Sequence, residues 1–296
     1  MTGVEDRPAP APDAAAASAP RVLAVRGLSK SFGGVRAVDD VTFEVHAGEV
    51  LSIIGPNGSG KTSTLNLLSG LLRPDRGTVE LHGERIERLT AARRTERGIN
   101  RTFQNGRVFG HLSVADNVFV GLYPRLARAR PFPALRHLPV LRWVGLLAEL
   151  VAALVQPAAV RREQADAHAR VDEQLARFGN RLTPRRDDLA RSLSYANRRR
   201  TEIARALVAR PAVLLLDEPT AGMNQTETAE LLDQLRALKA AGQTIVLVEH
   251  KIDLVMSLSD RVIVMDNGTV IADGPPAAIQ RDERVVEAYL GRHRGH

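Results

Sequence analysis

Short apolar runs alternate with amphipathic stretches along the chain, and this pattern predicts strands that alternate with helices. Three runs are apolar at nearly every position, which is typical of strands buried on both faces of a parallel sheet: residues 50–54, 213–216 and 244–248. Residues 41–45 alternate instead, as a half-buried strand does. The sequence Asp266-Asn267-Gly268 separates two further apolar runs and is a strong β-hairpin signal. We therefore expect an α/β core with a largely parallel sheet.

Helix signals stand between these strands. Ser113 is a suitable N-cap residue, with Asp116 in the first turn of the helix that follows it. Three longer helices are expected at residues 162–178, 194–209 and 226–241, and Gly242 marks the end of the last one.

Residues from about 121 to 157 form a proline-rich insertion, in which apolar residues dominate positions 140–155. Arg142 and Glu149 interrupt it, and the uncharged run between them is far below the roughly 18–20 residues that a membrane span requires. We expect an amphipathic helix or hairpin on the protein or at a membrane interface, or else an ordinary helical subdomain that packs on itself. Residues 1–20 are rich in alanine and proline, which predicts a disordered tail without a secretory signal.

A glycine-rich stretch fits the phosphate-binding pattern G-x-x-x-x-G-K-[ST] at every fixed position. It reads Gly55-Pro56-Asn57-Gly58-Ser59-Gly60-Lys61-Thr62 and lies between a buried run and a helix-like segment. Glycines let such a loop turn several N–H groups toward one anion, and the helix dipole adds its positive end. Lys61 would reach the β- and γ-phosphates, and the Thr62 hydroxyl would bind Mg²⁺. The alternative is a turn that merely precedes a lysine, but the flanking elements favour a nucleoside triphosphate site.

Polar residues follow the buried strands, at the edge where open α/β sheets hold their ligands. Asp217 and Glu218 follow one such strand, His250 comes just after the next, and Gln104 ends another run. Asp217 is placed to hold Mg²⁺ through water, and Glu218 to polarise a water for attack on the γ-phosphate. Gln104 would complete the metal shell or position water. As alternatives, the two carboxylates cap the following turn, and His250 is structural.

Composition narrows the function classes. The chain has 296 residues, of which 44% are hydrophobic and 25% charged, as in a soluble globular protein with one large domain or two modest ones. It has no cysteine, and its eight histidines lack ligand spacing, so we expect neither disulfides nor a structural zinc site. The net charge is +7, with arginine clusters at residues 93–101 and 198–200. No aromatic residues interleave with these arginines, which argues against a nucleic-acid groove and leaves an anionic membrane surface or no specific partner.

Together these motifs resemble the ATP-binding subunits of ABC transporters. The motifs that recur in this order in that family are the phosphate loop, Gln104, Leu193-Ser194-Tyr195-Ala196-Asn197, Asp217-Glu218 and His250. The resemblance covers about residues 21–291, which leaves 1–20 and 292–296 as tails. Longer matches resemble the branched-chain amino acid uptake branch of the family, namely Arg101 to Gln104, Asp217 to Asn224, Val248 to His250, Asp260 to Gly268 and Glu287 to Gly291.

The resemblance implies a fold and a composite site. The fold is a P-loop ATPase domain with a mostly parallel core sheet, an antiparallel β subdomain and a helical subdomain at about residues 110–204. Two subunits would bind head to tail and enclose each ATP between one phosphate loop and the other subunit's signature segment, where Ser194 caps a helix. Phe32 would stack on adenine, with a core-filling role as the alternative. The implied nucleotide-binding residues are Phe32, Gly55, Pro56, Asn57, Gly58, Ser59, Gly60, Lys61, Thr62, Ser63, Ser194 and Ala196; the implied metal ligands are Thr62, Gln104 and Asp217; the implied catalytic residues are Glu218, His250 and Gln104.

The same resemblance implies an activity and its partners. ATP and Mg²⁺ are the expected cofactors of an ATPase that energises an importer, with branched-chain or other amino acids as the expected solutes. The expected partners are integral membrane permease subunits, a second identical or homologous ATP-binding subunit and, indirectly, a solute-binding protein, but no nucleic acid. The helical region would take a coupling helix of the permease at the cytoplasmic face of the membrane. In this family, solute selectivity lies in the membrane and solute-binding subunits.

One position departs from the family's pattern. The signature has glycine in its fourth position, where this chain has Ala196, and Asn197 follows. Because glycine permits the closest approach of a backbone to a phosphate, we expect weak but nonzero ATPase activity that glycine at this position would raise. Two alternatives remain, a soluble ABC-type ATPase of translation or DNA repair and a regulatory module that holds ATP. The single phosphate loop and the lack of a heptad pattern disfavour the first, and the intact catalytic residues disfavour the second.

Overall fold

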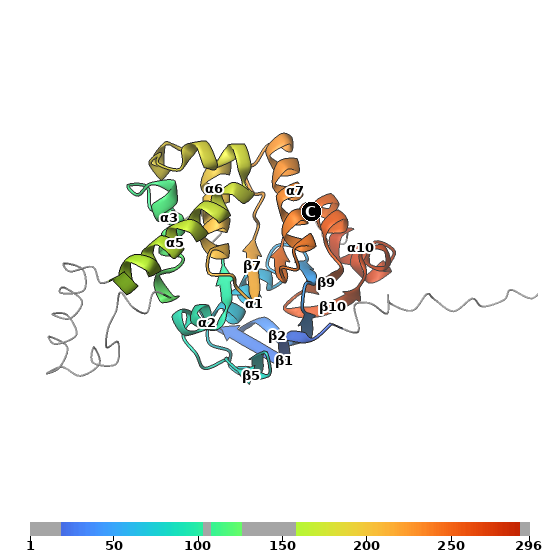
Figure 1. Cartoon of the computed structure of the whole chain (residues 1–296). Coiled ribbons are helices and arrows are strands. Elements are labelled where there is room, and N and C mark those ends of the chain that lie inside the picture. The colour runs from blue at the N-terminus through green and yellow to red at the C-terminus, as the bar shows by residue number, and fades with distance from the viewer. Residues whose placement is uncertain (1–18, 103–107, 126–157, 291–296) are drawn as a thin grey trace, which may run out of the picture.

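The structure, a computed structural model, describes residues 19–102, 108–125 and 158–290. Gln104, nearly all of the predicted tails and most of the predicted insertion lie outside these residues. Within them, no helix is both long enough and apolar enough to cross a membrane. Figure 1 shows two sheets in the middle and lower part of the view, with helices gathered above them.

A six-stranded sheet forms the centre of the fold, in the order β10-β9-β3-β8-β7-β6. Its strands are β3 (Val50–Ile54), β6 (Ile99–Arg101), β7 (Val213–Asp217), β8 (Ile245–Val248), β9 (Arg261–Asp266) and β10 (Thr269–Gly274). Neighbouring strands are parallel except for β9 and β10, which form the predicted hairpin. Strands β3, β7 and β8 are buried at every position, as their apolar sequences predicted.

An antiparallel sheet of four strands packs against this centre, in the order β2-β1-β4-β5. Its strands are β1 (Arg21–Phe32), β2 (Val35–His46), β4 (Arg76–Leu81) and β5 (Glu84–Arg85). Apolar side chains of this sheet, of the phosphate-loop helix and of the six-stranded sheet share one core. The prediction of a mostly parallel core sheet with an antiparallel β part is confirmed.

Helices flank the sheets. They are α1 (Lys61–Ser69), α2 (Ala91–Arg97), α3 (Val114–Val120), α5 (Ala158–Arg177), α6 (Tyr195–Leu207), α7 (Gln225–Ala240), α8 (Ile252–Leu258), α9 (Pro276–Ile279) and α10 (Glu283–Leu290). Short 3₁₀ turns occupy residues 123–125, 179–181, 183–185 and 190–192. The predicted caps are present, because the Ser113 and Ser194 side chains accept from Asp116 N and Asn197 N. Helices α2, α8, α9 and α10 were not predicted; each has at most eight residues, which is too short for a clear helical period.

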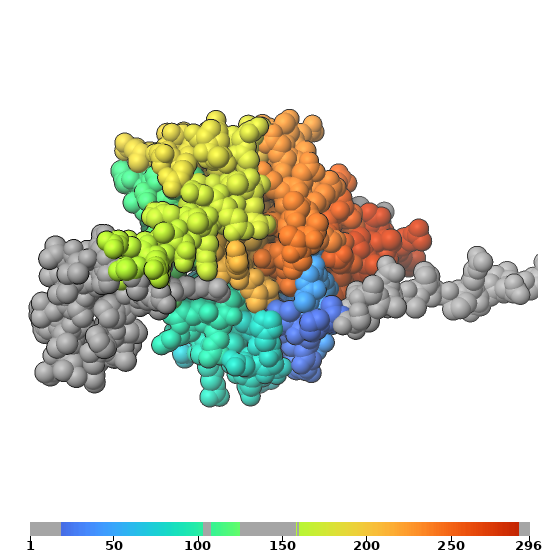
Figure 2. Space-filling view, viewed as in Figure 1, coloured from blue at the N-terminus to red at the C-terminus, as the bar shows by residue number. Residues whose placement is uncertain are grey.

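Helices α3, α5 and α6 pack on one another at the upper left of Figure 1. Their apolar side chains share a second core with α7 and with the six-stranded sheet. Glu230 on α7 pairs with Arg181 and with Arg200, which ties this helical region to α7. Figure 2 accordingly shows the surfaces of α5 and α7 as one continuous face.

The two arginine clusters are not one basic surface. Arg94, Arg199 and Arg200 are fully buried, and Arg101 is nearly so. Their guanidinium groups donate to backbone carbonyls and carboxylates inside the protein. Part of the positive charge counted from the sequence is therefore internal.

Arg94 shows how such a buried charge stabilises the fold. Its guanidinium donates to the carbonyl oxygens of Leu67 (2.5 Å) and Leu68 (2.8 Å) in the last turn of α1, and to Glu87 O (2.9 Å). The last turn of a helix carries unsatisfied carbonyls and the negative end of the helix dipole, so a cation there is favourable. Burial lowers the pKa of Arg94 to about 10, and the Glu87 carboxylate opposes that shift, so Arg94 stays charged at neutral pH.

We predict that Arg94→Met destabilises the protein by about 3 kcal/mol, because it leaves several buried carbonyls without donors. The midpoint of thermal unfolding, followed by circular dichroism, measures this loss. Arg93→Met is the matched control: Arg93 lies on the exposed side of α2 and pairs with Glu96, so its loss should cost at most about 0.5 kcal/mol. Equal losses in the two variants would contradict the capping role of Arg94.

Candidate functional site

The glycine-rich loop joins β3 to α1 at the edge where the parallel strands end. Gly60, the N-cap of α1, has φ 100°, and Gly58 has φ 83°; both values favour glycine. A Cβ at Gly55 would collide with Met265 O, and one at Gly60 with Ala37 O, whereas one at Gly58 would meet nothing within 4 Å. The loop is therefore fixed to β2 and β9 on one side and open at Gly58, which is the geometry of an anion cradle.

Lys61, the first residue of α1, is buried against this loop. Its Nζ donates to Gly55 O (2.8 Å) and Pro56 O (2.9 Å). Thr62 is exposed and Ser63 is half-buried in the same first turn. The ammonium and the two hydroxyl groups thus stand at the N-terminus of α1, where an anion is favoured.

Asp217 is the last residue of β7 and is buried. Its Oδ2 accepts from Arg101 Nη2 at 2.7 Å, while its Oδ1 is buried without a hydrogen-bond partner among the described residues. An unpartnered carboxylate oxygen is costly to bury unless a ligand reaches it. Carboxylate and hydroxyl oxygens are the donors that Mg²⁺ prefers, so Asp217 and Thr62 fit the expected ion.

Glu218, the predicted base, stands in a strained turn immediately after β7. Its φ is 45°, which is rare for a residue with a side chain and is often found at functional sites. Its N–H donates to Val248 O (2.8 Å), and its carbonyl accepts from Ala221 N (3.1 Å). These two bonds hold the half-buried residue in its left-handed conformation.

His250 lies beyond the end of β8, beside this turn. Its ring is 58% exposed, and its Nδ1 lies 3.5 Å from Glu249 Oε2. The backbone bond between Glu218 and Val248 places the residues after β7 and β8 next to each other. The two predicted catalytic side chains therefore start from adjacent turns at one sheet edge, as predicted. The third, Gln104, lies outside the described residues.

Glu249 is a site residue that the sequence analysis missed. Its carboxylate is fully buried and accepts from Thr220 N (3.1 Å), the Thr220 hydroxyl and His250 N (2.8 Å). Lys251, two residues after Glu249, donates through Nζ to Thr220 O (3.3 Å). These contacts bind the turn after Glu218 to the turn that carries His250. The sequence signal that could have identified Glu249 is a charged residue directly after an apolar strand.

Tyr289 on α10 was also missed as a site residue. Burial raises the pKa of its hydroxyl, and a hydrogen bond with the backbone of Gly55 acts in the opposite direction. The C-terminal helix is thereby tied to the first glycine of the phosphate loop. The segment Glu287 to Gly291 was matched to the family from sequence, but no residue of it was given a role.

The signature segment, residues 193–197, presents two of its residues to solvent and buries three, the first of which is Leu193. Ser194 and Tyr195 are exposed, with Tyr195 at 45%, whereas Ala196 is 2% exposed and belongs to the helical core. Asn197 is also buried and accepts from Arg200 Nη1 (3.1 Å). Since the Ala196 methyl packs into the core, the steric reason for expecting weak ATPase activity is wrong.

Phe32 ends β1 with 46% of its surface exposed. Lys30 Nζ lies 5.7 Å from the centre of its ring, within the range of a cation–π contact. Lys30 also donates to Asp75 (2.6 Å), and this bond, with one from Ser31 N, holds the pKa of Asp75 below its usual value. The exposed ring is free of the core, so the core-filling alternative for Phe32 is wrong.

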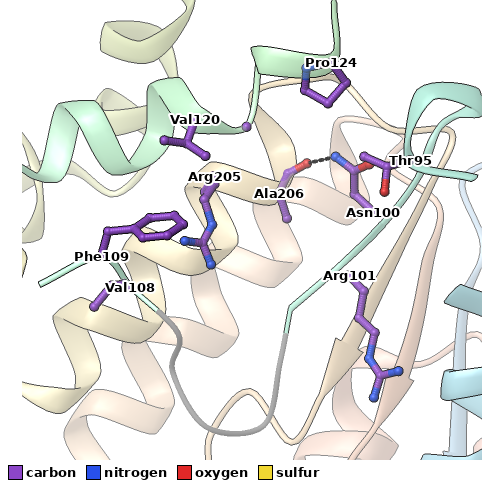
Figure 3. Close-up of a pocket in the computed structure, with 10 residues that line it drawn as sticks. Thr95, Asn100, Arg101, Val108, Phe109, Val120, Pro124, Arg205 and Ala206 are labelled. Atoms are coloured by element: carbon purple, nitrogen blue, oxygen red, sulfur yellow. Dashed lines mark hydrogen bonds between the residues drawn. The ribbon is translucent and has the colours of Figure 1, made fainter. Parts of the chain in front are cut away.

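A groove of about 410 Å³ lies between β6 and the helical region. Its lining residues are Thr95, Asn100, Arg101, Val108, Phe109, Val120, Gly121, Pro124, Arg205 and Ala206 (Figure 3). The Arg205 guanidinium lies 5.5 Å from the centre of the Phe109 ring. Burial lowers the pKa of this guanidinium. Phe109 is half-exposed at the opening, which leaves an apolar surface beside the half-buried guanidinium of Arg205.

Comparisons with known proteins agree with this geometry. The ABC transporter family model matches residues 38–221, and the model of the branched-chain amino acid ATP-binding cassette transporter matches residues 269–294. The high-affinity branched-chain amino acid transport ATP-binding protein LivG of Salmonella typhimurium is 37% identical over 91% of this chain and 98% of its own length. BraF of Pseudomonas aeruginosa, with the same description, is 36% identical over the same shares. The lipopolysaccharide export system ATP-binding protein LptB of Haemophilus influenzae is 31% identical over 91% of this chain and 97% of its own.

Solved structures agree as well. A nucleotide-free ATP-binding cassette from an ABC transporter superposes with a TM-score of 0.73 and 28% identity, and covers 92% of this chain and all of the cassette. An ATP-binding cassette in its ADP conformation gives a TM-score of 0.71 over 92% of this chain and 99% of its own, also at 28% identity. The chain belongs to the ABC transporter family, as an ATP-binding subunit that hydrolyses ATP.

Proposed function

We propose that this chain energises the import of branched-chain or other amino acids by hydrolysing ATP beside a membrane permease. The observation that carries the proposal is the meeting of the phosphate loop, Asp217, Glu218 and His250 at one sheet edge. The solute class is supported by the C-terminal family match and by the relatives LivG and BraF, whose full length the chain nearly spans. LptB serves a different cargo on the same fold, so the solute is the part of the proposal that needs its own test.

Each residue at the edge has a chemical task in this proposal. The loop N–H groups and Lys61 hold the β- and γ-phosphates, and Phe32 stacks on adenine. Thr62 and the free oxygen of Asp217 hold Mg²⁺, with Gln104 as a further ligand; when bound, the ion screens phosphate charge. Glu218 accepts a proton from the attacking water, and His250 donates a hydrogen bond to the γ-phosphate.

The site is completed by a second subunit. Ser194 and Tyr195 are exposed at the N-terminus of α6, a helix of 13 residues whose first N–H groups favour an anion. A head-to-tail dimer places this end against the γ-phosphate held by the other subunit. Loss of the γ-phosphate on hydrolysis then removes the anion that both subunits share, and the dimer opens.

The groove beside β6 suits the permease. Apolar walls, an exposed Phe109 and a half-buried Arg205 fit an amphipathic helix with an acidic or carbonyl-bearing end. In this proposal the chain is peripheral at the cytoplasmic face, and a helix between membrane spans of the permease enters the groove. A solute-binding protein then contributes only through the permease, and no nucleic acid takes part.

We predict that Glu218→Gln lowers ATP turnover by about 100-fold or more, because an amide cannot accept the proton of the attacking water. ATP binding should persist, so the variant should accumulate as an ATP-bound dimer. Phosphate release and light scattering measure the two effects. Glu96→Gln, an exposed change on α2, should leave both unchanged. A Glu218→Gln variant that hydrolyses ATP at the wild-type rate would remove Glu218 from the chemistry.

We predict that cells lacking this chain take up labelled leucine, isoleucine or valine poorly from dilute medium. Wild-type chain should restore uptake, and the Glu218→Gln variant should not, because transport depends on hydrolysis. Lysine uptake is the control for general energy supply. No uptake defect in the cells that lack the chain would contradict the proposed solute class while leaving the ATPase assignment intact. Restoration by both forms would contradict the dependence of transport on Glu218 instead.

We predict that Ala196→Gly leaves ATP turnover unchanged and lowers stability by about 1–2 kcal/mol, because it removes a buried methyl group and places glycine in a helix. Turnover of the assembled transporter and the thermal midpoint of the purified chain are the measurements. Higher turnover in the glycine variant would instead support the expectation from the sequence that the Ala196 side chain slows ATP hydrolysis.

A further inference from the structure

Arg101 is the last residue of β6, and its side chain reaches Asp217 and the phosphate-loop helix α1. The guanidinium donates through Nη2 to Asp217 Oδ2 (2.7 Å) and through Nη1 to Asn66 Oδ1 (2.6 Å) and Ser69 Oγ (3.1 Å). Asn66 and Ser69 belong to α1, the helix that begins at the phosphate loop. One planar group thus fixes the Asp217 carboxylate relative to that helix.

The ion pair is almost dry, since the side chains of Arg101 and Asp217 are 6% and 1% exposed. Arg101 occupies Oδ2 and leaves Oδ1 without a hydrogen-bond partner among the described residues. The guanidinium therefore holds the buried carboxylate turned in one direction. Arg199 also reaches this residue, where it donates to the backbone carbonyl of Asp217.

The same residue lines the groove beside the helical region. Figure 3 shows the Arg101 side chain pointing away from Phe109 and Arg205, while its backbone runs along the groove. Asn100, the preceding residue, donates to Ala206 O (2.6 Å) and so fastens β6 to α6 at this point. The strand end at the groove is therefore joined to α6 through Asn100 and to Asp217 through Arg101.

We propose that Arg101 positions the Asp217 carboxylate for Mg²⁺ and couples it to occupation of the groove. The proposal rests on the proposed function, because it takes Asp217 as the metal carboxylate and the groove as the permease site. Arg101 is a positioning residue here: it acts on the metal through Asp217 and on the permease through the end of β6. Partners of a ligating carboxylate commonly tune metal affinity in this way.

The first test is the affinity of the full chain for a fluorescent ATP analogue, measured once with Mg²⁺ and once with EDTA. In Arg101→Met we expect the gain in affinity that Mg²⁺ gives to fall by about 10- to 100-fold, with the EDTA value unchanged. Arg101→Lys keeps the charge but not the planar fork, so it should recover part of the gain. An undiminished or larger Mg²⁺ gain in Arg101→Met would overturn the proposal.

Two further variants guard against a folding defect. Arg93→Met removes an exposed arginine that belongs to neither the groove nor the Asp217 ion pair, so the gain in affinity that Mg²⁺ gives should equal that of the wild type. Asn66→Ala removes one acceptor that holds the guanidinium and leaves the ion pair in place. It should reduce the Mg²⁺ gain less than Arg101→Met does. If Arg101→Met does not fold, an unchanged gain in both Asn66→Ala and Arg101→Lys would overturn the proposal instead.

The second test concerns coupling to the groove, measured as retention of the purified chain on immobilised permease with and without Mg²⁺ and ATP. Coupling between two ligands is reciprocal. If the permease changes the affinity of the chain for Mg²⁺-ATP, then Mg²⁺-ATP changes the affinity of the chain for the permease. We expect wild-type retention to depend on Mg²⁺-ATP and Arg101→Met retention to be independent of it. Arg205→Met should weaken retention under both conditions.

The failures can be told apart. A chain that no permease retains would contradict the proposed function. A chain that is retained, with equal Mg²⁺-ATP dependence in wild type and Arg101→Met, would overturn the coupling role of Arg101 alone. A wild-type affinity that does not respond to Mg²⁺ would overturn the metal assignment of Asp217 and this proposal with it.

Discussion

The buried carboxylate of Glu249 is the constraint on which the geometry of the sheet edge depends. A charge removed from water is tolerated only where donors surround it, and Thr220 and the backbone of His250 supply them. Because these donors belong to the turns after β7 and β8, the two turns cannot move independently without exposing the charge or leaving it unpaired. The strained backbone of Glu218 persists because the turn beside it is held from both sides.

Buried arginines repeat this logic elsewhere. Arg94 holds the end of α1, Arg199 holds the backbone at the end of β7, and Arg200 joins α6 to α7. A well-packed apolar residue in such a place often gives equal or greater stability, so stability alone does not explain a dry guanidinium. What the guanidinium adds is direction, since its planar fork fixes several acceptors at once. The elements that carry the ATP site are thus held in register by charge as well as by packing.

Much of the fold followed from local patterns. The apolar runs 50–54, 213–216 and 244–248 became buried strands, and Ser113 and Ser194 became caps, because these signals depend on neighbours in the sequence. The phosphate loop was recognisable from its glycines at fixed spacing. Gly55 and Gly60 are needed there because other backbone segments approach them too closely for a side chain.

What could not be predicted depends on contacts between distant residues. Whether an arginine is buried, as Arg94 is, depends on the carbonyls of a helix 26 residues earlier in the chain. The direction of the Ala196 methyl depends on how α6 packs, so the sequence departure was visible but its consequence was not. Glu249 accepts hydrogen bonds from Thr220, and Tyr289 bonds with the backbone of Gly55. No local sequence pattern connects the two residues of either pair.

The separation of the two surfaces explains how one fold serves different cargoes. The sheet edge at the phosphate loop is built from strand ends and a helix N-terminus, and its proposed contacts with phosphate, metal and water are compatible with little variation. The groove is built from residues of β6, the turn at Phe109 and α6, and in the proposed function its occupant is a permease helix that can vary with them. LptB and LivG are both similar to this chain over 91% of its length but are named for different cargoes, as expected if cargo depends on what enters the groove. The two surfaces meet at the end of β6, so the link between them has to pass through the few residues there.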